Sequence, residues 1–342
     1  MKQSTFNLGQ FIKDYVMYFV LIILIIVFSI LCKSTGVNFM SLTNLSNIVY
    51  QNMYLVVIGV GITIIMLAGA MDLSTGYQVS TISVVMGLMA KSGVEFILII
   101  LTGLVLGVVL GAVNGAIYAR LKVFPFVITL AVQYVLHGIT YLLSDSKTLR
   151  DFDSGFKFLG QTKFKLTDSY SLPLALLILA LLVLIGSFIL NKTYFGRNIY
   201  ALGSNPDAVA LSGVSVAKMR VLVFAVAGIF VALGSFLNAS RLGSVGSQTG
   251  VGAEFTVMAG AMLGGIKMGG GGGKMSNMVV GVLIIGVLNN GMNLLNVDQN
   301  WQYVAMGVVL LLAIVLDTLQ TESAAKRAKM VAGQPPTATE QK

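Results

Sequence analysis

The sequence predicts an all-α, polytopic membrane protein with about ten transmembrane helices, some of them short or broken. Apolar residues make up 56% of the 342 positions, charged residues only 10%, and the mean hydropathy is +0.88. A soluble domain carries about a quarter charged residues, so this composition cannot cover a water-facing surface. Several uninterrupted apolar runs reach the roughly 18 to 20 residues that a helix needs to cross the hydrocarbon layer.

Apolar runs mark the candidate spans along the chain. They occupy residues 15–32, 49–69, 74–90, 96–118, 124–143, 173–190, 220–239, 253–266, 276–296 and 301–317. The third and eighth runs are short and contain glycine or threonine, so we expect half-helices or re-entrant segments there, with protein or a water-filled cavity covering the backbone. No small-x-small cleavage site follows the first run, which predicts a retained helix and no signal peptide.

The distribution of lysine and arginine predicts the orientation in the membrane. If the N-terminus is inside, fourteen of the 22 basic residues are cytoplasmic, namely Lys2, Lys13, Arg120, Lys122, Lys192, Arg197, Lys218, Arg220, Lys267, Lys274, Lys326, Arg327, Lys329 and Lys342. This excess satisfies the positive-inside rule and, with an even number of spans, places both termini in the cytoplasm. The chain then divides into a cytoplasmic N-terminus (1–14), a transmembrane domain (15–318) with an external loop (144–172) and a cytoplasmic loop (191–219), and a partly disordered cytoplasmic tail (319–342).

Composition excludes several function classes. Cys32 is the only cysteine and His137 the only histidine, so disulfide frameworks, Cys/His metal sites and Cys/His dyads have no basis. The net charge of +9 does not predict nucleic-acid binding, because the basic residues lie in short loops without interleaved aromatic residues, and membrane lipid is the better partner. The glycine run 269–273 before Lys274 departs from the phosphate-binding pattern and is interpreted as a flexible turn. We predict no catalytic site, no metal and no cofactor in this chain.

Glycines recur every four residues in the fourth span, at Gly103, Gly107, Gly111 and Gly115, and therefore share one helix face. Small residues at this spacing let a second helix approach closely, which predicts a packing seam. The alternative is a smooth wall beside a transport pathway.

An isolated acid, Asp72, stands in the segment AGAMDLSTG (68–76), between the second and third spans. Followed by Ser74 and Gly76, it fits a helix N-cap, which is the interpretation we favour. An ionised carboxylate is costly at membrane depth, so the alternative places these three residues at the wall of a pathway. Glu254, near the start of the eighth span, is the other isolated acid and is assigned to the same candidate pathway.

The ninth span contains Asn289, Asn290, Asn293 and Asn296. On a helix, Asn289, Asn293 and Asn296 share one face, which is unfavourable against lipid. These amides either bind hydroxyl groups in a pathway or join helices to each other, and both interpretations stay open. Asn289, Asn290 and Asn293 complete the candidate pathway.

The inner loop FGRNIYALGSNPDAVALSGVSVAKMR (195–220) predicts a short helix. Asn205 and Pro206 form a helix start, Asp207 suits the positive N-terminus, and the next four residues continue the helix. A short apolar helix between glycines at the membrane surface fits a contact with a cytoplasmic partner. The residues singled out for this contact are Gly203, Asn205, Pro206, Asp207, Ala208, Ala210, Ser212 and Gly213.

These segments together resemble the permease subunits of the ribose, galactose and xylose branch of bacterial ABC importers. The resemblance is carried by MDLSTG (71–76), VNG (113–115) with VFPFVITLA (123–131), FGRNIYALGSNPDAVALSGVSV (195–216), and LGG, GGGGGK, GVLNNGMNLL and WQYVAMGVVLLLAIVLD through the last spans. DFDSGF (151–156) is similar to the galactose and methyl-galactoside permeases more than to the ribose permeases. Where the family shows Glu-Leu-Asp, this chain has Glu254, Phe255 and Thr256, so the role of a second acid is not carried over.

The resemblance implies a bacterial inner-membrane permease that imports a monosaccharide, such as ribose, galactose or xylose, by alternating access. It implies three partners: a second permease copy, identical or closely paralogous; a cytoplasmic ATPase with two nucleotide-binding domains, which holds ATP and Mg²⁺; and a periplasmic or lipid-anchored sugar-binding protein. Residues 205–212 would be the coupling helix that fits a groove on the ATPase, with Gly203 and Gly213 permitting its turns.

Two other classes compete with this interpretation. A secondary sugar symporter would need charged partners within several helices for ion coupling, whereas Asp72 and Glu254 are nearly alone. An intramembrane enzyme would need a nucleophile–base or metal constellation, which one histidine and one cysteine do not supply.

Overall fold

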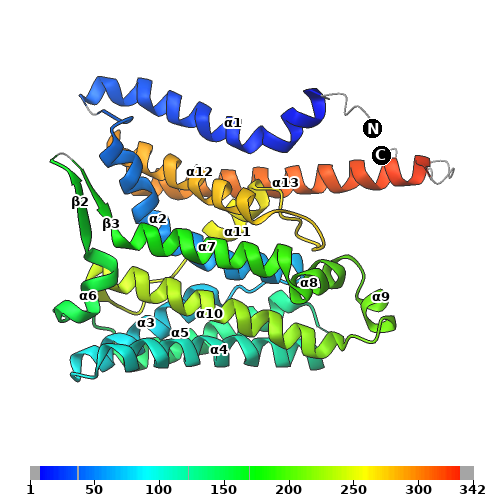
Figure 1. Ribbon diagram of the computed structural model, residues 1–342, viewed down its shortest axis with the longest axis horizontal. Helices are drawn as coiled ribbons and strands as arrows, with labels where there is room; N and C mark the ends of the chain where they lie inside the picture. Colours follow the sequence, from blue (N-terminus) through cyan, green and yellow to red (C-terminus); the bar gives the residue numbers. More distant parts are fainter. Residues whose placement is uncertain (1–7, 37, 122, 169, 332–342) are drawn as a thin grey trace.

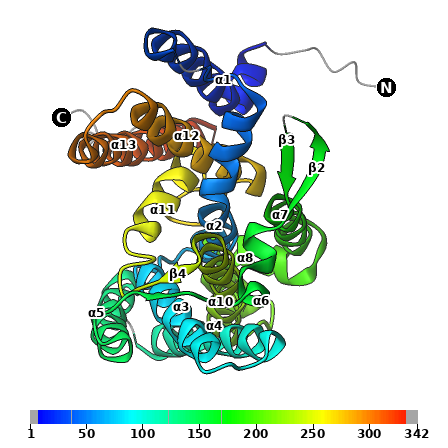
Figure 2. The ribbon, with the colours of Figure 1, turned by 90° about the vertical axis from the view of Figure 1, so that its left-hand side faces the viewer.

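The computed structural model describes residues 8–36, 38–121, 123–168 and 170–331 and shows a bundle of α-helices (Figures 1 and 2). Each of the ten predicted spans contains a helix, which confirms the predicted fold class. These helices are α1 (Leu8–Leu31), α2 (Leu42–Leu67), α3 (Thr75–Lys91), α4 (Phe96–Arg120), α5 (Pro125–Ser144), α7 (Leu174–Lys192), α10 (Val216–Leu242), α11 (Ala253–Leu263), α12 (Met275–Leu294) and α13 (Gln299–Val331). Residues 1–7 and 332–342, in the predicted cytoplasmic termini, lie outside the described residues.

The helices that correspond to the third and eighth runs are short, as the sequence predicts. Within the described part of the chain, seven helices are long and apolar enough to cross a membrane, namely α1, α2, α4, α5, α7, α10 and α12. Helix α3 has 17 residues and α11 has 11. At 1.5 Å per residue α11 is about 16 Å long, roughly half of the hydrocarbon thickness. It is therefore a half-helix.

Helices α2 and α10 form the centre of the bundle. Both are apolar nearly all round, and both start at a serine whose hydroxyl accepts a backbone N–H, from Asn44 in α2 and from Lys218 in α10. They run antiparallel, because Ile58 of α2 lies against Gly234, whereas Gly61, further along α2, lies against the earlier Ala227.

Each central helix leads into a non-helical break and then a short helix. Residues 68–74 connect α2 to α3, and residues 243–252 connect α10 to α11. Because α2 and α10 are antiparallel, the two breaks enter the bundle from opposite ends. They meet inside it, where Gly76 in the first turn of α3 lies against Glu254 in the first turn of α11.

The glycine repeat of α4 is a packing seam against α10, as predicted. Gly107 lies against the backbone of Gly228, and Gly111 against that of Phe224. A Cβ atom at either glycine would overlap these backbone atoms. The long α4–α10 contact therefore depends on the missing side chains.

The loop predicted to be external (144–172) carries ordered structure that the sequence did not predict. Strand β1 (Leu149–Arg150) pairs antiparallel with β4 (Ser244–Val245), and β2 (Lys163–Thr167) with β3 (Tyr170–Pro173). Between them lies α6 (Ser154–Gln161). Strand β1 thus ties the loop to the break that follows α10.

The segment DFDSGF has a structural role in this loop. Asp153 caps α6 by accepting the backbone N–H of Phe156 at 2.9 Å. Phe152 and Phe156 are buried, with ring centroids 4.5 Å apart. These contacts anchor α6 on the bundle.

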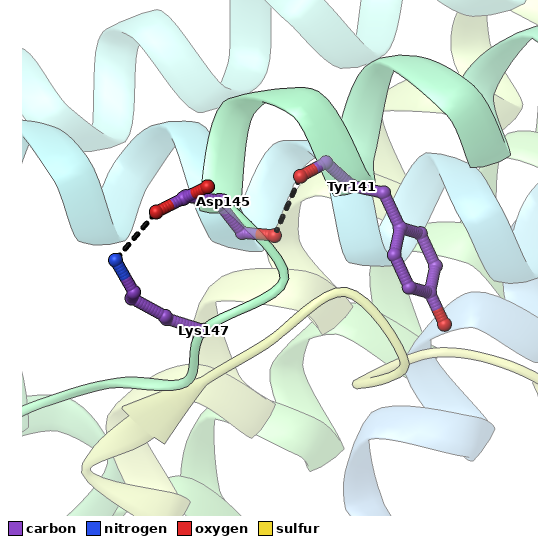
Figure 3. A network of polar contacts seen from close by, with 4 residues as sticks. Tyr141, Asp145 and Lys147 are labelled. Atoms are coloured by element: carbon purple, nitrogen blue, oxygen red, sulfur yellow. Dashed lines mark hydrogen bonds and ion pairs between the residues drawn. The ribbon is translucent and has the colours of Figure 1, made fainter.

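Helix α5 ends beside an exposed ion pair (Figure 3). Asp145 adopts a left-handed conformation with φ of 50°, and the Lys147 ammonium donates to its carboxylate at 2.5 Å. The pair lowers the pKa of Asp145 and raises that of Lys147. Because both side chains are exposed, the pair contributes little to stability.

The two ends of the bundle differ in what they carry. Figure 1 shows that α1 begins and α13 ends at the end where α8 (Tyr194–Ser204) and α9 (Pro206–Leu211) lie. The hairpin β2–β3 and α6 lie at the opposite end. Both terminal helices therefore share an end with the loop at 191–219.

Candidate functional site

The short helix predicted in the loop 191–219 is α9, and its ends are fixed by local hydrogen bonds. The Asn205 side chain accepts the backbone N–H of Ala208 at 3.0 Å, and Pro206 occupies the first helical position. At the other end the Ser212 hydroxyl donates to the Val209 carbonyl at 2.7 Å. Gly213 follows with φ of +84°, which glycine adopts without strain.

Helix α9 presents an apolar surface to its surroundings. Only Val209 is buried, whereas Ala208 and Ala210 are exposed and Leu211 is 91% exposed. We did not single out Leu211 from the sequence, and its exposure is the signal that identifies it. A rigid, capped helix with an uncovered leucine is a suitable contact for a partner protein.

The resemblance implied that Gly203 permits the turn that precedes α9. The structure does not place Gly203 in that turn. It lies within α8, and a Cβ atom there would overlap the Leu67 carbonyl and the backbone of Gly271. Its role is close packing, since α8 meets the end of α2 at this position.

The glycine run 269–273 is held in place at the same junction. The Gly271 N–H donates to the Leu67 carbonyl at 2.9 Å, and the Tyr200 hydroxyl of α8 donates to the Gly273 carbonyl at 3.1 Å. Burial raises the pKa of Tyr200. The run is a turn within the connection between α11 and α12, and these hydrogen bonds join it to α8 and to the end of α2, while its flexibility stays a prediction.

Asp72 is the centre of a buried hydrogen-bond network. Its carboxylate accepts the Ser74 N–H at 2.9 Å, the Ser74 hydroxyl at 2.5 Å and the Gln78 amide at 2.9 Å. Asn114 of α4 donates to Asp72 at 3.4 Å and to the Ser74 hydroxyl at 2.8 Å. The N-cap of α3 is Ser74, and Asp72 stands two residues before it. The Asp72 carboxylate thus holds the start of α3 and joins α3 to α4.

Glu254 lies in the first turn of α11 and has a different environment. Its side chain is buried, and its Oε2 atom has no hydrogen-bond partner among the described residues. That atom faces Gly76, whose missing side chain provides the space for it. No group of three or more histidine, cysteine, aspartate or glutamate side chains in the described part of the chain could hold a metal ion.

A cavity of about 450 Å³ lies between α2, α11, α12 and α13. Figure 2 shows α11 beside α2, next to α12 and α13. None of the side chains around the cavity is charged. Its lining comprises Tyr54, Val251, Gly252, Ala253, Phe255, Thr256, Asn289, Gln299, Gln302, Tyr303 and Met306. Of the residues assigned to the candidate pathway, Asn289 alone is in this lining.

The other asparagines of the ninth span serve different purposes. Asn290 is buried and exchanges amide hydrogen bonds of 3.2 and 3.3 Å with Asn44 at the start of α2, so it joins helices. Asn293 is exposed and accepts from Gln302 at 2.8 Å. Asn296 does not share the helix face with Asn289, because α12 ends at Leu294 and Asn296 follows with φ of 55°.

The chain matches the family model described as branched-chain amino acid transport system / permease component over residues 44–314. The ribose import permease of Bacillus subtilis (strain 168) is 36% identical over 299 residues, which are 87% of this chain and 90% of that protein. The galactose/methyl galactoside import permease of Escherichia coli (strain K12) is 33% identical over 327 residues, 91% and 95% of the two chains.

A third relative is the L-arabinose transport system permease of Escherichia coli (strain K12), 31% identical over 315 residues, 92% of this chain and 93% of that protein. No solved structure matches the chain. The ribose and galactose relatives match to a similar extent, so the greater similarity to galactose permeases stays a prediction.

Proposed function

The chain belongs to the family of transport-system permease components, and from that membership we propose that it is the membrane-spanning subunit of an ATP-driven monosaccharide importer. Three relatives that each cover most of its length are permeases named for ribose, galactose or methyl galactoside, and L-arabinose. The substrate proposed here is accordingly a monosaccharide of that kind. The transport cycle is alternating access, with hydrolysis on a separate ATPase.

The observation that carries this proposal is the exposed, capped helix α9. Leu211 and the two alanines form an apolar surface at a bundle end, where a groove on a cytoplasmic ATPase would cover it. The packing at Gly203 gives a route by which movement of α9 reaches the pathway, because α8 contacts both the end of α2 and the connection between α11 and α12.

The complete importer has three further components in this proposal. A second permease copy, identical or paralogous, completes the pathway. A cytoplasmic ATPase with two nucleotide-binding domains binds ATP and Mg²⁺ and moves α9. A periplasmic or lipid-anchored binding protein delivers the sugar to the end that carries α6 and the hairpin β2–β3.

The same proposal sets the orientation in the bacterial inner membrane, with both termini and the loop 191–219 in the cytoplasm. Cysteines placed at Ser204 and at Ser146, each in a Cys32→Ser background, test it. An impermeant thiol reagent applied from outside should label position 146 and spare position 204. Labelling of position 204 alone would reverse the orientation.

Charge placed on α9 tests the coupling. Ala208→Glu and Ala210→Arg leave every span intact, so the permease should insert normally, but a charge buried in a close groove should reduce uptake and ATPase copurification together, by tenfold or more. Lys192→Glu is the matched control, because it changes an exposed charge at the C-terminal end of α7, at the same end of the bundle as α9. It should retain both uptake and ATPase copurification. Normal uptake by both α9 variants, or uptake by the permease alone driven by an ion gradient, would favour a symporter.

A further inference from the structure

The exposed faces of the bundle differ in polarity. Helix α4 exposes valines at Val105, Val109 and Val113, as expected against lipid. The first turns of α13 instead expose Gln299 and Tyr303 beside the cavity of about 450 Å³. Trp301 and Val304 are exposed in the same turns, so the start of α13 presents a mixed surface on which Gln299 and Tyr303 form the polar side, next to the cavity.

We propose that the cavity between α2, α11, α12 and α13 binds the sugar in transit through hydrogen bonds with the uncharged side chains of Tyr54, Asn289 and Gln302. This inference rests on the proposed function and adds to it a location and a mode of recognition. The cavity is within the size range of small-molecule sites.

The three polar groups have hydrogen-bonding capacity left for a ligand. Among the described residues, no hydrogen bond joins the Asn289 amide or the Tyr54 hydroxyl to another residue. The Gln302 amide nitrogen donates to Asn293 at 2.8 Å and to the Val297 carbonyl at 3.2 Å. Both of its hydrogens are therefore used, and its Oε1 atom is fixed in position as an acceptor.

The neutral lining selects the chemical class of the ligand. A sugar hydroxyl both donates and accepts hydrogen bonds, which suits amides and a phenol. An amino acid zwitterion would bring two charges to a cavity whose lining contains no charged side chain, and burying a charge without a direct partner is unfavourable. The Tyr303 ring adds an amphipathic surface for the apolar face of a sugar ring.

The test removes hydrogen-bonding groups without touching α9. In the native bacterium, a deletion of this gene is complemented with wild type, Asn289→Ala, Gln302→Ala or Asn300→Ala. Uptake of labelled D-ribose, D-galactose, L-arabinose and L-leucine is measured, with the ATPase activity of the complex purified through a tagged permease. Asn300 is an exposed amide in the same helix turn as Gln302 but outside the cavity lining, so it is the matched control.

We expect each cavity variant to lower uptake of the transported sugar about five- to tenfold, as the loss of a ligand hydrogen bond would. ATPase copurification and activity should stay normal, and Asn300→Ala should match wild type. Sugar uptake that is unchanged in both cavity variants would overturn this inference and leave the proposed function intact. Wild-type uptake of L-leucine and of no sugar, or of none of the four compounds, would overturn the proposed function itself.

Discussion

Asp72 and Glu254 occupy similar places in the two breaks of the bundle. Each stands at the start of a short helix that follows a long central one, and each is buried, with 3% and 1% of its surface exposed. Asp72 accepts hydrogen bonds from Ser74, Gln78 and Asn114, whereas the Oε2 atom of Glu254 has no partner in the part of the chain that the structure describes. Two acids in matching positions are thus satisfied to very different degrees.

The difference indicates which break is framework and which can respond to a substrate. The network of Asp72 joins α3 to α4, and none of its residues lines the cavity. Glu254 has Ala253 and Phe255 as neighbours, and both line the cavity. Buried polar atoms in native proteins are nearly always paired, and Glu254 Oε2 is, among the described residues, an unpaired carboxylate oxygen beside the cavity wall, whereas the Asp72 carboxylate is paired on both oxygens. We therefore expect stability to depend mainly on Asp72 and transport to depend mainly on Glu254.

The largest effect is expected at Asp72. Leucine at this position would remove the acceptor of the Ser74 N–H and hydroxyl and one of the two acceptors of the Gln78 amide, at a cost on the order of 3 to 5 kcal/mol. Asp72→Leu should therefore lose folding and uptake, measured as monodisperse protein in detergent and as transport. Asparagine keeps one acceptor oxygen and should preserve folding and part of the uptake. If Asp72→Leu is as active as wild type, the first break is not the framework.

A smaller effect is expected where the breaks touch. A methyl group at Gly76 would overlap Glu254 Oε2 and approach the Gly250 carbonyl, so Gly76→Ala should cost about 1 to 3 kcal/mol in thermal unfolding. Adding Glu254→Ala should recover part of that loss, because one of the two overlapping groups is then gone. Gly138→Ala in α5 is the control: no atom lies within 4 Å of its added methyl group. Additive losses in the double variant would show that the breaks are independent.

Local chemistry was predictable from the sequence, and contacts between distant segments were not. The Asn205 cap, the turn at Gly213 and the seam at Gly107 depend on neighbouring residues or on one helix face, and the structure has all three. The close packing at Gly203 was not predicted, because it depends on Leu67, which is far away in the sequence.

Two further features depended on information that periodicity does not contain. Asn296 was placed on a helix face because the apolar run continues past the point where α12 ends. The cavity combines four helices from both halves of the chain, and only Asn289 was recognised in advance, since an amide in an apolar span is unusual. Gln302 carries the same signal, since it is an amide in the predicted span 301–317, but it was not singled out, whereas Tyr54 carries no such local signal.

The smallest effect on stability, and the sharpest test of the comparison, is expected for Glu254→Gln. The two side chains have the same shape, and the unpaired Oε2 atom contributes no hydrogen bond that the substitution could break. The midpoint of thermal unfolding should therefore change by less than the equivalent of about 1 kcal/mol. Uptake of the transported sugar should fall, because the variant changes the charge or proton content of the turn that forms the cavity wall. If Glu254→Gln instead destabilises the protein as much as Asp72→Asn and leaves uptake normal, both acids belong to the framework.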